Sequence, residues 1–316
     1  MLTRVLCLLF VAIASVNAQD QPAFPLKSKR VVFLGDSITH AGGFIVYLEA
    51  ELIARGLEPR PEMINLGLPS ETCSGLSEPI HPFPRPNVHE RLDRALARTK
   101  PDVVVVCYGM NDGIYYPFGE QRFDRYQAGI KKIEKKVHAA RAKLVLMTPT
   151  VFDPSPQKPN KNLMSLGQKE YSWKAPYKDY DKDVLQKYGE WILSRKGKAE
   201  MIVNLRKPLI AALKEKRAKD PKFEMAGDGV HINEDGHRMV AKALANAWGL
   251  TGELRAKKEL VDLVRKKQAL MHGSWLSHVG HKRPGPPAGL PLKEARVKEA
   301  EYREQIELHV ANAALK

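Results

Sequence analysis

The sequence predicts an α/β fold in which a parallel β-sheet is covered by helices on both faces. Short runs rich in β-branched residues alternate with longer helical patterns from about residue 30 to residue 250, as in consecutive βα units. One short run, 103–106, consists of four valines without polar alternation, which is typical of a strand buried on both faces. We therefore expect this strand to lie in the middle of the sheet.

The expected elements follow one another in regular order. Strands are expected at 30–34, 63–66, 103–107, 144–147 and 201–204, and helices at 43–55, 87–98, 122–140, 206–218 and 234–247. A proline-rich stretch over 149–176 interrupts this order. Because it follows a strand, it should overhang the carboxyl edge of the sheet, where open parallel sheets bind their ligands.

Both ends of the chain lie outside the alternating region. Residues 1–18 carry Arg4, an apolar run and then small residues, the pattern of a cleavable secretory signal with cleavage after Ala18. The run is shorter than the ~20 apolar residues that span a bilayer, so a membrane anchor is the less favoured alternative and no transmembrane segment is expected. Residues 253–316 show two helical patterns, at 253–271 and 293–314, and form either a cap on the core or a solvated arm.

These patterns divide the chain into three expected parts. They are a signal peptide over 1–18, a main domain over 19–252 and a C-terminal helical extension over 253–316. The protein is expected to be secreted or periplasmic once the signal has been removed.

The composition is that of a globular protein. Hydrophobic residues make up 43% and charged residues 28% of the chain, which excludes the disordered, fibrous and multi-span membrane classes. Three cysteines are too few for a disulfide scaffold, and loss of the signal leaves Cys73 and Cys107, whose pairing stays open.

The net charge of +15 favours anionic partners, although Lys and Arg are scattered along helical stretches, as on solvated faces. Association with an anionic surface is left open. No basic stripe interleaved with aromatic residues is present in the sequence, so no nucleic-acid partner is expected.

A serine follows the first expected strand. The strand ends in Gly35-Asp36-Ser37, and Gly42 and Gly43 precede the next helix. Ser37 would lie on a strand-to-helix turn at the sheet edge, beside backbone N–H groups that favour negative charge, which is the position of a nucleophile. The alternative is that Asp36 or Ser37 only caps the helix.

An acid and a histidine lie three residues apart near the end of the alternating region. Asp228 can hold the tautomer of His231 and stabilise its protonated form, while the other ring nitrogen takes a proton from Ser37. Metal binding by Asp228, His231 and His237 is the alternative, but the sequence lacks H-E-x-x-H and cysteine–histidine patterns. We expect no metal or organic cofactor, and we interpret His237 as structural.

An asparagine follows the central strand, in the stretch Gly109-Met110-Asn111-Asp112. The amide of Asn111 could donate a hydrogen bond to a developing oxyanion, or Asn111 could be only a turn residue. Tyr115, Tyr116 and Phe118 come next, and they either line a small apolar pocket or pack in the core.

Three short motifs make the sequence resemble the SGNH hydrolases, also called the GDSL esterase and lipase family. They are Gly35-Asp36-Ser37, Gly109-Met110-Asn111-Asp112 and Asp228-Gly229-Val230-His231, in the family's order over about residues 30–250. The resemblance implies a flavodoxin-like three-layer α/β/α sandwich with a five-stranded parallel sheet. It also implies a Ser37–His231–Asp228 triad and an oxyanion hole made by the Ser37 N–H, an N–H of a second block and the Asn111 side chain.

The second block, 65–72, departs from the family pattern. The family's oxyanion glycine falls on Ser70, which supplies an N–H unless the backbone needs a positive φ that only glycine adopts cheaply. Gly67 is the alternative donor. The longer form, from Gly67 through Gly75 to Glu78 and Pro79, looks like a secreted bacterial subgroup, planctomycete-type proteins included, that often carries an extra C-terminal helical extension.

The resemblance implies a secreted serine esterase that forms an acyl-enzyme on Ser37. O-acetyl esters of carbohydrates are the favoured substrates because the chain carries an export signal and lacks a broad apolar lid for long acyl chains. The expected partner is therefore a small-molecule or polysaccharide ester. One alternative is a lipase or thioesterase acting on longer acyl chains. The other is a non-catalytic envelope or polysaccharide-binding protein that uses its positive charge.

Overall fold

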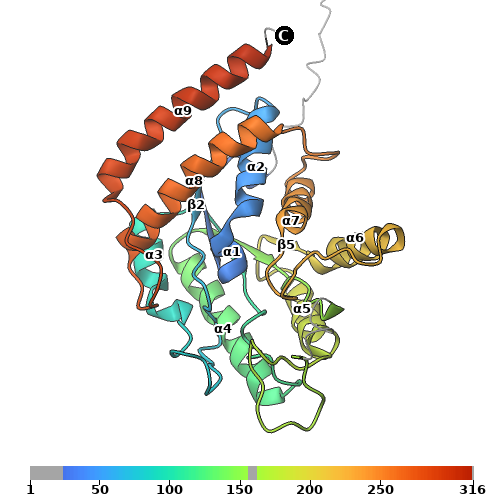
Figure 1. Ribbon diagram of the computed structural model, residues 1–316. Helices are drawn as coiled ribbons and strands as arrows, with labels where there is room; N and C mark the ends of the chain where they lie inside the picture. The colour runs from blue at the N-terminus through green and yellow to red at the C-terminus, as the bar shows by residue number, and fades with distance from the viewer. Residues whose placement is uncertain (1–23, 156–161, 315–316) are drawn as a thin grey trace, which may run out of the picture.

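A five-stranded parallel sheet forms the centre of the protein, as expected (Figure 1). The structure is a computed structural model that describes residues 24–155 and 162–314, so the expected signal peptide lies outside the described residues. The strand order is β2-β1-β3-β4-β5. The strands are β1 (Arg30–Gly35), β2 (Glu62–Asn65), β3 (Val103–Cys107), β4 (Lys143–Met147) and β5 (Met201–Val203).

Helices cover both faces of this sheet. The described helices are α1 (Ser37–Ala41), α2 (Gly43–Ala54), α3 (Leu92–Thr99), α4 (Glu120–Ala139), α5 (Gln186–Leu193), α6 (Arg206–Lys219), α7 (Glu234–Ala247), α8 (Lys258–Val279) and α9 (Leu292–Ala314). On one face α2 packs against α7, and on the other α3 packs against α4. The three-layer α/β/α prediction is therefore confirmed.

Two local predictions were inaccurate. The helix expected at 87–98 is a 3₁₀ turn, η1 (Val88–Glu90), followed by α3. The π-helical turn η3 (Asp181–Leu185) and α5, which it leads into, were not predicted. The polar sequence of this segment, directly after the proline-rich stretch, has only a weak helical pattern. Tertiary packing makes it helical in spite of that weak local preference.

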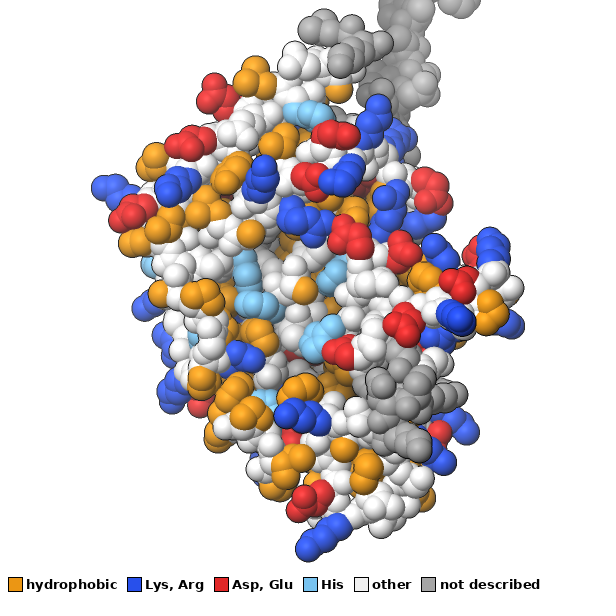
Figure 2. Space-filling model, viewed as in Figure 1, with side chains coloured by type: hydrophobic (Ala, Val, Ile, Leu, Met, Phe, Trp, Pro, Cys, Tyr) orange, Lys and Arg blue, Asp and Glu red, His pale blue; other side chains and the backbone are white. Residues whose placement is uncertain are grey.

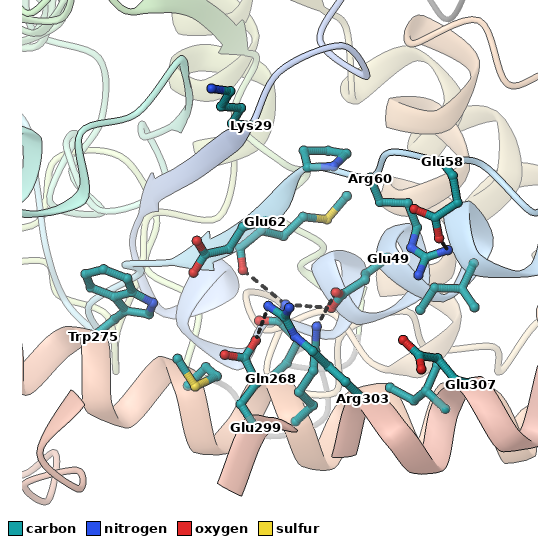
Figure 3. Close-up of a pocket in the computed structure, with 16 residues that line it drawn as sticks. Lys29, Glu49, Glu58, Arg60, Glu62, Gln268, Trp275, Glu299, Arg303 and Glu307 are labelled. Atoms are coloured by element: carbon teal, nitrogen blue, oxygen red, sulfur yellow. Dashed lines mark hydrogen bonds and ion pairs between the residues drawn. The ribbon is translucent and has the colours of Figure 1, made fainter. Parts of the chain in front are cut away.

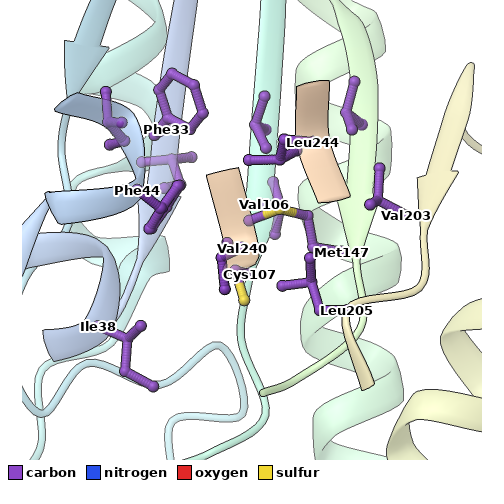
Figure 4. Close-up of a cluster of buried hydrophobic side chains, with 14 of the residues drawn as sticks. Phe33, Ile38, Phe44, Val106, Cys107, Met147, Val203, Leu205, Val240 and Leu244 are labelled. Carbon is purple, nitrogen blue, oxygen red and sulfur yellow. The ribbon is translucent and has the colours of Figure 1, made fainter. Parts of the chain in front are cut away.

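The central strand is buried on both faces. The side chains of Val103 to Val106 are at most 1% exposed, and β3 pairs with β1 on one side and β4 on the other. Figure 4 shows Val106 and Met147 of the sheet meeting Val240 and Leu244 of α7. The prediction of a mid-sheet strand is confirmed.

The C-terminal extension is a cap packed on the core, and α8 covers the open edge of the sheet (Figure 1). β2 is an edge strand, so its outward carbonyls have no neighbouring strand. Gln268 Nε2 donates to the carbonyl of Met63 at 3.1 Å, and His272 Nδ1 donates to that of Asn65 at 2.9 Å. Side chains of α8 thus donate hydrogen bonds to backbone carbonyls at the open edge of the sheet. The domain boundary at residue 252 stays a prediction.

A polar cavity of about 390 Å³ lies where α2 and β2 meet α8 and α9 (Figure 3). Ion pairs join the surrounding elements at this cavity. Lys267 of α8 binds Glu49 of α2, and Arg296 of α9 binds Glu62 of β2. This cavity is a charged contact zone that ties the extension to the sheet edge.

Two open questions about the chain can now be addressed. Cys73 and Cys107 are both buried and free, so they form no bridge. Within the described ranges, no helix combines the length and apolarity needed to cross a bilayer.

Candidate functional site

Ser37 lies at the first position of α1, directly after β1. The N-cap is Asp36, whose Oδ1 accepts a hydrogen bond from the Ile38 N–H at 3.0 Å. Capping is therefore done by Asp36, and the Ser37 hydroxyl is left to face the loop between α6 and α7. At Gly35 a Cβ would lie 2.2 Å from Thr39 Oγ1, so only glycine lets α1 fold back this closely on the strand.

The structure brings the three residues of the expected triad together. His231 Nε2 lies 2.8 Å from Ser37 Oγ, and His231 Nδ1 lies 2.5 Å from Asp228 Oδ2. Ser37 and His231 are 194 residues apart in sequence. Ser37 lies at the carboxyl end of β1, and the loop between α6 and α7 brings His231 to the same edge of the sheet.

The short loop from Asp228 to His231 fixes the acid relative to the base. Asp228 Oδ1 accepts the backbone N–H groups of His231 at 2.7 Å and Val230 at 2.9 Å. Burial acts to raise the pKa of Asp228, but the hydrogen bonds from His231 and the backbone outweigh it and lower the pKa to about 2. The hydrogen bond to Asp228 raises the pKa of His231, against the opposing effect of burial. An ionised Asp228 thus makes His231 a stronger base.

Ser37 shares a cavity of about 570 Å³ with two hydrogen-bond donors, the Asn111 side chain and the Ser70 N–H. Asn111 has its amide oriented by neighbours: Tyr115 Oη donates to Asn111 Oδ1 at 3.0 Å, and Asn111 Nδ2 donates to the Glu71 carbonyl at 3.3 Å. One amide hydrogen remains for a ligand. In the part of the chain that the structure describes, no acceptor lies within hydrogen-bond distance of the Ser70 N–H.

Ser70 adopts a left-handed backbone conformation with φ of 65°. This is the case in which glycine would be favoured, so the serine is held there against its preference. Arg85 donates to the Ser70 carbonyl at 3.3 Å. Arg283 Nε donates to the Pro69 carbonyl at 2.7 Å, so neighbours position the peptide groups on both sides of Ser70.

Gly67 has a different task. Its N–H donates to Asn65 Oδ1 at 2.8 Å, and a Cβ at this position would lie 2.2 Å from the His40 N. Gly67 thus allows the second block to approach α1, and its N–H is already used.

Buried charged groups hold the second block in place, and sequence reasoning did not identify them. Arg91 binds Glu71 through two hydrogen bonds of 2.6 Å, and Tyr108 Oη donates to the same carboxylate at 2.6 Å. Asp112 Oδ1 accepts the N–H groups of Cys73 at 2.9 Å and of the next residue at 2.8 Å. No local pattern reveals these contacts because the partners are 20 to 40 residues apart.

The cavity wall also contains residues that the sequence analysis did not select. They come from three loops and are His81, Pro82, Phe83, Arg85, Trp173, Lys174 and Arg283. Figure 2 shows histidine side chains near the middle of this face of the molecule, with Lys and Arg side chains around them. Trp173 and Lys174 belong to the proline-rich stretch, which therefore overhangs the sheet edge as expected.

Of the three aromatic residues after Asn111, Tyr115 lines the cavity. Tyr116 packs against Tyr171 and Phe118 against Phe123, so these two are packing residues.

The site offers no metal-binding geometry in its described part. His237 is buried and stacks on Phe44 with ring centroids 6.2 Å apart, which fits the structural interpretation. Among residues 24–155 and 162–314, no three His, Cys, Asp or Glu side chains are grouped so that they could hold a metal ion.

The geometry joins a hydroxyl, an imidazole and a carboxylate in series beside N–H donors, an arrangement that can perform acyl transfer. The sequence profile of the GDSL-like lipase/acylhydrolase family matches residues 33–239. The chain belongs to this family. It is an ester-hydrolysing enzyme of the SGNH type. No sequence among curated proteins matches it.

Several solved structures are similar to this enzyme. A gut microbial diltiazem-metabolizing enzyme has a TM-score of 0.56 at 22% identity, over 71% of this chain and 47% of that one, so our chain spans about half its length. An acetylxylan esterase from Geobacillus stearothermophilus has a TM-score of 0.50 at 19% identity, over 73% and 97% of the two chains. A single-residue variant of that esterase gives 0.51 at 20% identity, over 71% and 96%. At these identities the likeness shows the fold alone.

Proposed function

We propose that this enzyme is a serine esterase that forms an acyl-enzyme on Ser37. The observation that carries the proposal is the hydrogen-bonded series from Ser37 Oγ through His231 to Asp228, at 2.8 Å and 2.5 Å. His231 takes the Ser37 proton as Oγ attacks the ester carbonyl, and it returns that proton to the leaving alcohol. It then deprotonates the water that attacks the acyl-enzyme, and it gives that proton to Ser37 Oγ as the acid product leaves.

Three donors are proposed to stabilise the tetrahedral oxyanion. They are the N–H of Ser37 at the start of α1, the N–H of Ser70 and the Asn111 amide. The first helical N–H groups have no intrahelical acceptor, which supports the first donor. We place Ser70 and not Gly67 in this role, because the Gly67 N–H donates to Asn65.

We propose O-acetyl esters of carbohydrates as the substrates. The cavity beside Ser37 is open and carries polar groups beside the rings of Phe83 and Trp173, which suits a sugar better than a long acyl chain. The fold likeness to an acetylxylan esterase agrees with this proposal.

We further propose that the enzyme is exported and cleaved near Ala18, which the charge and apolar run of the first 18 residues support. Membership of the secreted bacterial, planctomycete-type subgroup is a proposal too. It is supported by the second-block sequence from Gly67 to Pro79 and by α8 and α9.

Fluorophosphonate labelling tests the nucleophile directly. Wild type and the control Ser194→Ala, which alters an exposed serine outside the cavity, should be labelled, whereas Ser37→Ala should not. No labelling of any variant, together with no hydrolysis of 4-nitrophenyl acetate, would remove the esterase mechanism and favour the binding-protein alternative. A preference for 4-nitrophenyl octanoate over acetate would favour the lipase or thioesterase alternative.

A further inference from the structure

Two cations in the wall of the Ser37 cavity have no acidic partner among the described residues. Arg85 also lines the cavity, but it is paired with Glu78 through hydrogen bonds of 2.6 Å and 2.7 Å. Arg283 and Lys174 differ from it, because no carboxylate of the described residues lies within ion-pair distance of either side chain.

Arg283 is held in a defined position at this wall. Its Nε donates to the Pro69 carbonyl at 2.7 Å, and its guanidinium lies 5.1 Å from the centre of the Phe83 ring. Both partners are neutral, so they orient the cation without compensating its charge. Burial, and to a smaller extent the charge of Arg85, lower the pKa of Arg283, so a bound anion would favour its charged form.

Lys174 comes from the proline-rich loop that overhangs the same cavity. Its Nζ lies 5.2 Å from the ring centre of Trp173, and Trp173 is 41% exposed. Among the charges lining the cavity, Asp228 is engaged by His231. The described wall therefore combines apolar rings with uncompensated positive charge.

We propose that Arg283 and Lys174 bind an anionic group of the substrate, so that the enzyme acts on O-acetyl esters of acidic oligosaccharides. This inference rests on the proposed esterase function and specifies its substrate class. A carboxylate or sulfate on a sugar unit near the acetylated one would meet the guanidinium of Arg283, which suits planar anions. The rings of Phe83 and Trp173 would contact the apolar faces of the sugars.

The proposal assigns a role to the C-terminal extension. Arg283 follows α8, beyond residue 239, where the match to the family profile ends. Arg94 of α3 fixes the end of α8 by donating to the carbonyls of Val279 at 3.1 Å and Gly280 at 3.2 Å. The extension thus carries Arg283 to the cavity.

Acetate release from three oligosaccharides tests the proposal. The substrates are O-acetylated oligogalacturonate, an O-acetylated sulfated galactan oligosaccharide and neutral O-acetylated xylo-oligosaccharide. Wild type should show at least a tenfold higher kcat/KM for one or both acidic substrates at low salt, with most of the difference in KM. Comparing the oligogalacturonate with the sulfated galactan shows whether a carboxylate or a sulfate is preferred. Added salt should reduce this preference because it screens the charges.

Substitutions at Arg283 and Lys174 test whether these two residues cause the preference for acidic substrates. Arg283→Met and Lys174→Met should each reduce the ratio of acidic to neutral kcat/KM several-fold, and Arg283→Lys should retain part of it. The matched control is Lys282→Met, since Lys282 is exposed and lies outside the cavity. It should leave the ratio unchanged.

Two results would overturn the inference: equal kcat/KM for acidic and neutral substrates, or an equal loss on both in Arg283→Met and Lys174→Met, which a merely structural role would produce. Hydrolysis of 4-nitrophenyl acetate separates the two proposals. If wild type hydrolyses it without any preference for acidic sugars, this inference fails and the esterase proposal stands. If wild type does not hydrolyse it, both fail.

Discussion

Replacing Ser70 with glycine is expected to stabilise the protein without loss of activity. Ser70 has φ of 65°, in the left-handed region, and no described residue accepts a hydrogen bond from its hydroxyl. The Ser70→Gly variant removes the Cβ that makes this conformation unfavourable. It keeps the backbone N–H that we place in the oxyanion hole.

The expected magnitude follows from two opposing contributions. The left-handed conformation costs a residue with a Cβ about 1–2 kcal/mol. Glycine gives back roughly 0.5–1 kcal/mol, because its unfolded chain has more conformational freedom to lose. The net gain in the free energy of unfolding is therefore about 0.5–1 kcal/mol, which raises Tm by ~2 °C in a protein of this size.

Chemical denaturation, thermal melting and 4-nitrophenyl acetate kinetics measure these effects. The matched control is Ser70→Ala, which removes the hydroxyl but keeps the Cβ, so its stability should stay close to wild type. Both variants should retain kcat within about threefold, since backbone N–H donors are retained. A loss of stability in Ser70→Gly would refute the strain argument, and a large loss of kcat in both variants would show that the hydroxyl itself acts in the site.

Three further predictions concern separate parts of the molecule. Asn111→Ala should lower kcat for 4-nitrophenyl acetate by about 10²–10³-fold, with a small change in KM, because it removes a donor used in the transition state. Asp36→Asn should gain stability relative to wild type as pH rises from about 4 to 7 in urea denaturation. Burial raises the pKa of Asp36 to about 7, so wild type loses stability over this range, by up to about 4 kcal/mol, as the unfolded carboxyl ionises first. Gln268→Ala should lower the free energy of unfolding by about 1–3 kcal/mol, measured the same way, because it leaves the Met63 carbonyl without its buried donor and Glu49 with Lys267 as its remaining partner.

Each of these three predictions has an outcome that would contradict it. An Asn111→Ala variant with wild-type kcat would exclude the amide from the oxyanion hole. A constant stability difference between Asp36→Asn and wild type across pH would show that the Asp36 carboxyl titrates normally. For the sheet edge, the control is Gln186→Ala, which alters an exposed glutamine of α5. An equal effect of both glutamine variants would contradict the argument that Gln268 satisfies the edge of β2.

The strands and the Asp228–His231 pair were predictable because their signals are local. Apolar runs identify the strands, and the four valines of 103–106 identify the central one. Asp228 and His231 share one short loop, so their spacing alone brings the carboxylate to the imidazole. Ser37 could be paired with them because the family resemblance implies a Ser37–His231–Asp228 triad.

Other features depended on elements that meet only in the folded chain. The choice between Ser70 and Gly67 rests on a φ value and on a hydrogen bond to Asn65, neither of which residue type reveals. Cys73 and Cys107 are free because they pack in different parts of the core.

The amino-acid sequence by itself determined which residues are apolar, which turns follow the strands, and thus the sheet and the nucleophile at its edge. Only the tertiary structure placed α8 on the edge of β2 and Arg283 beside Pro69, across 214 residues of chain. The physical reason is that such contacts form when helices and loops far apart in the sequence pack against one another. This packing leaves no periodic or short-range pattern along the chain.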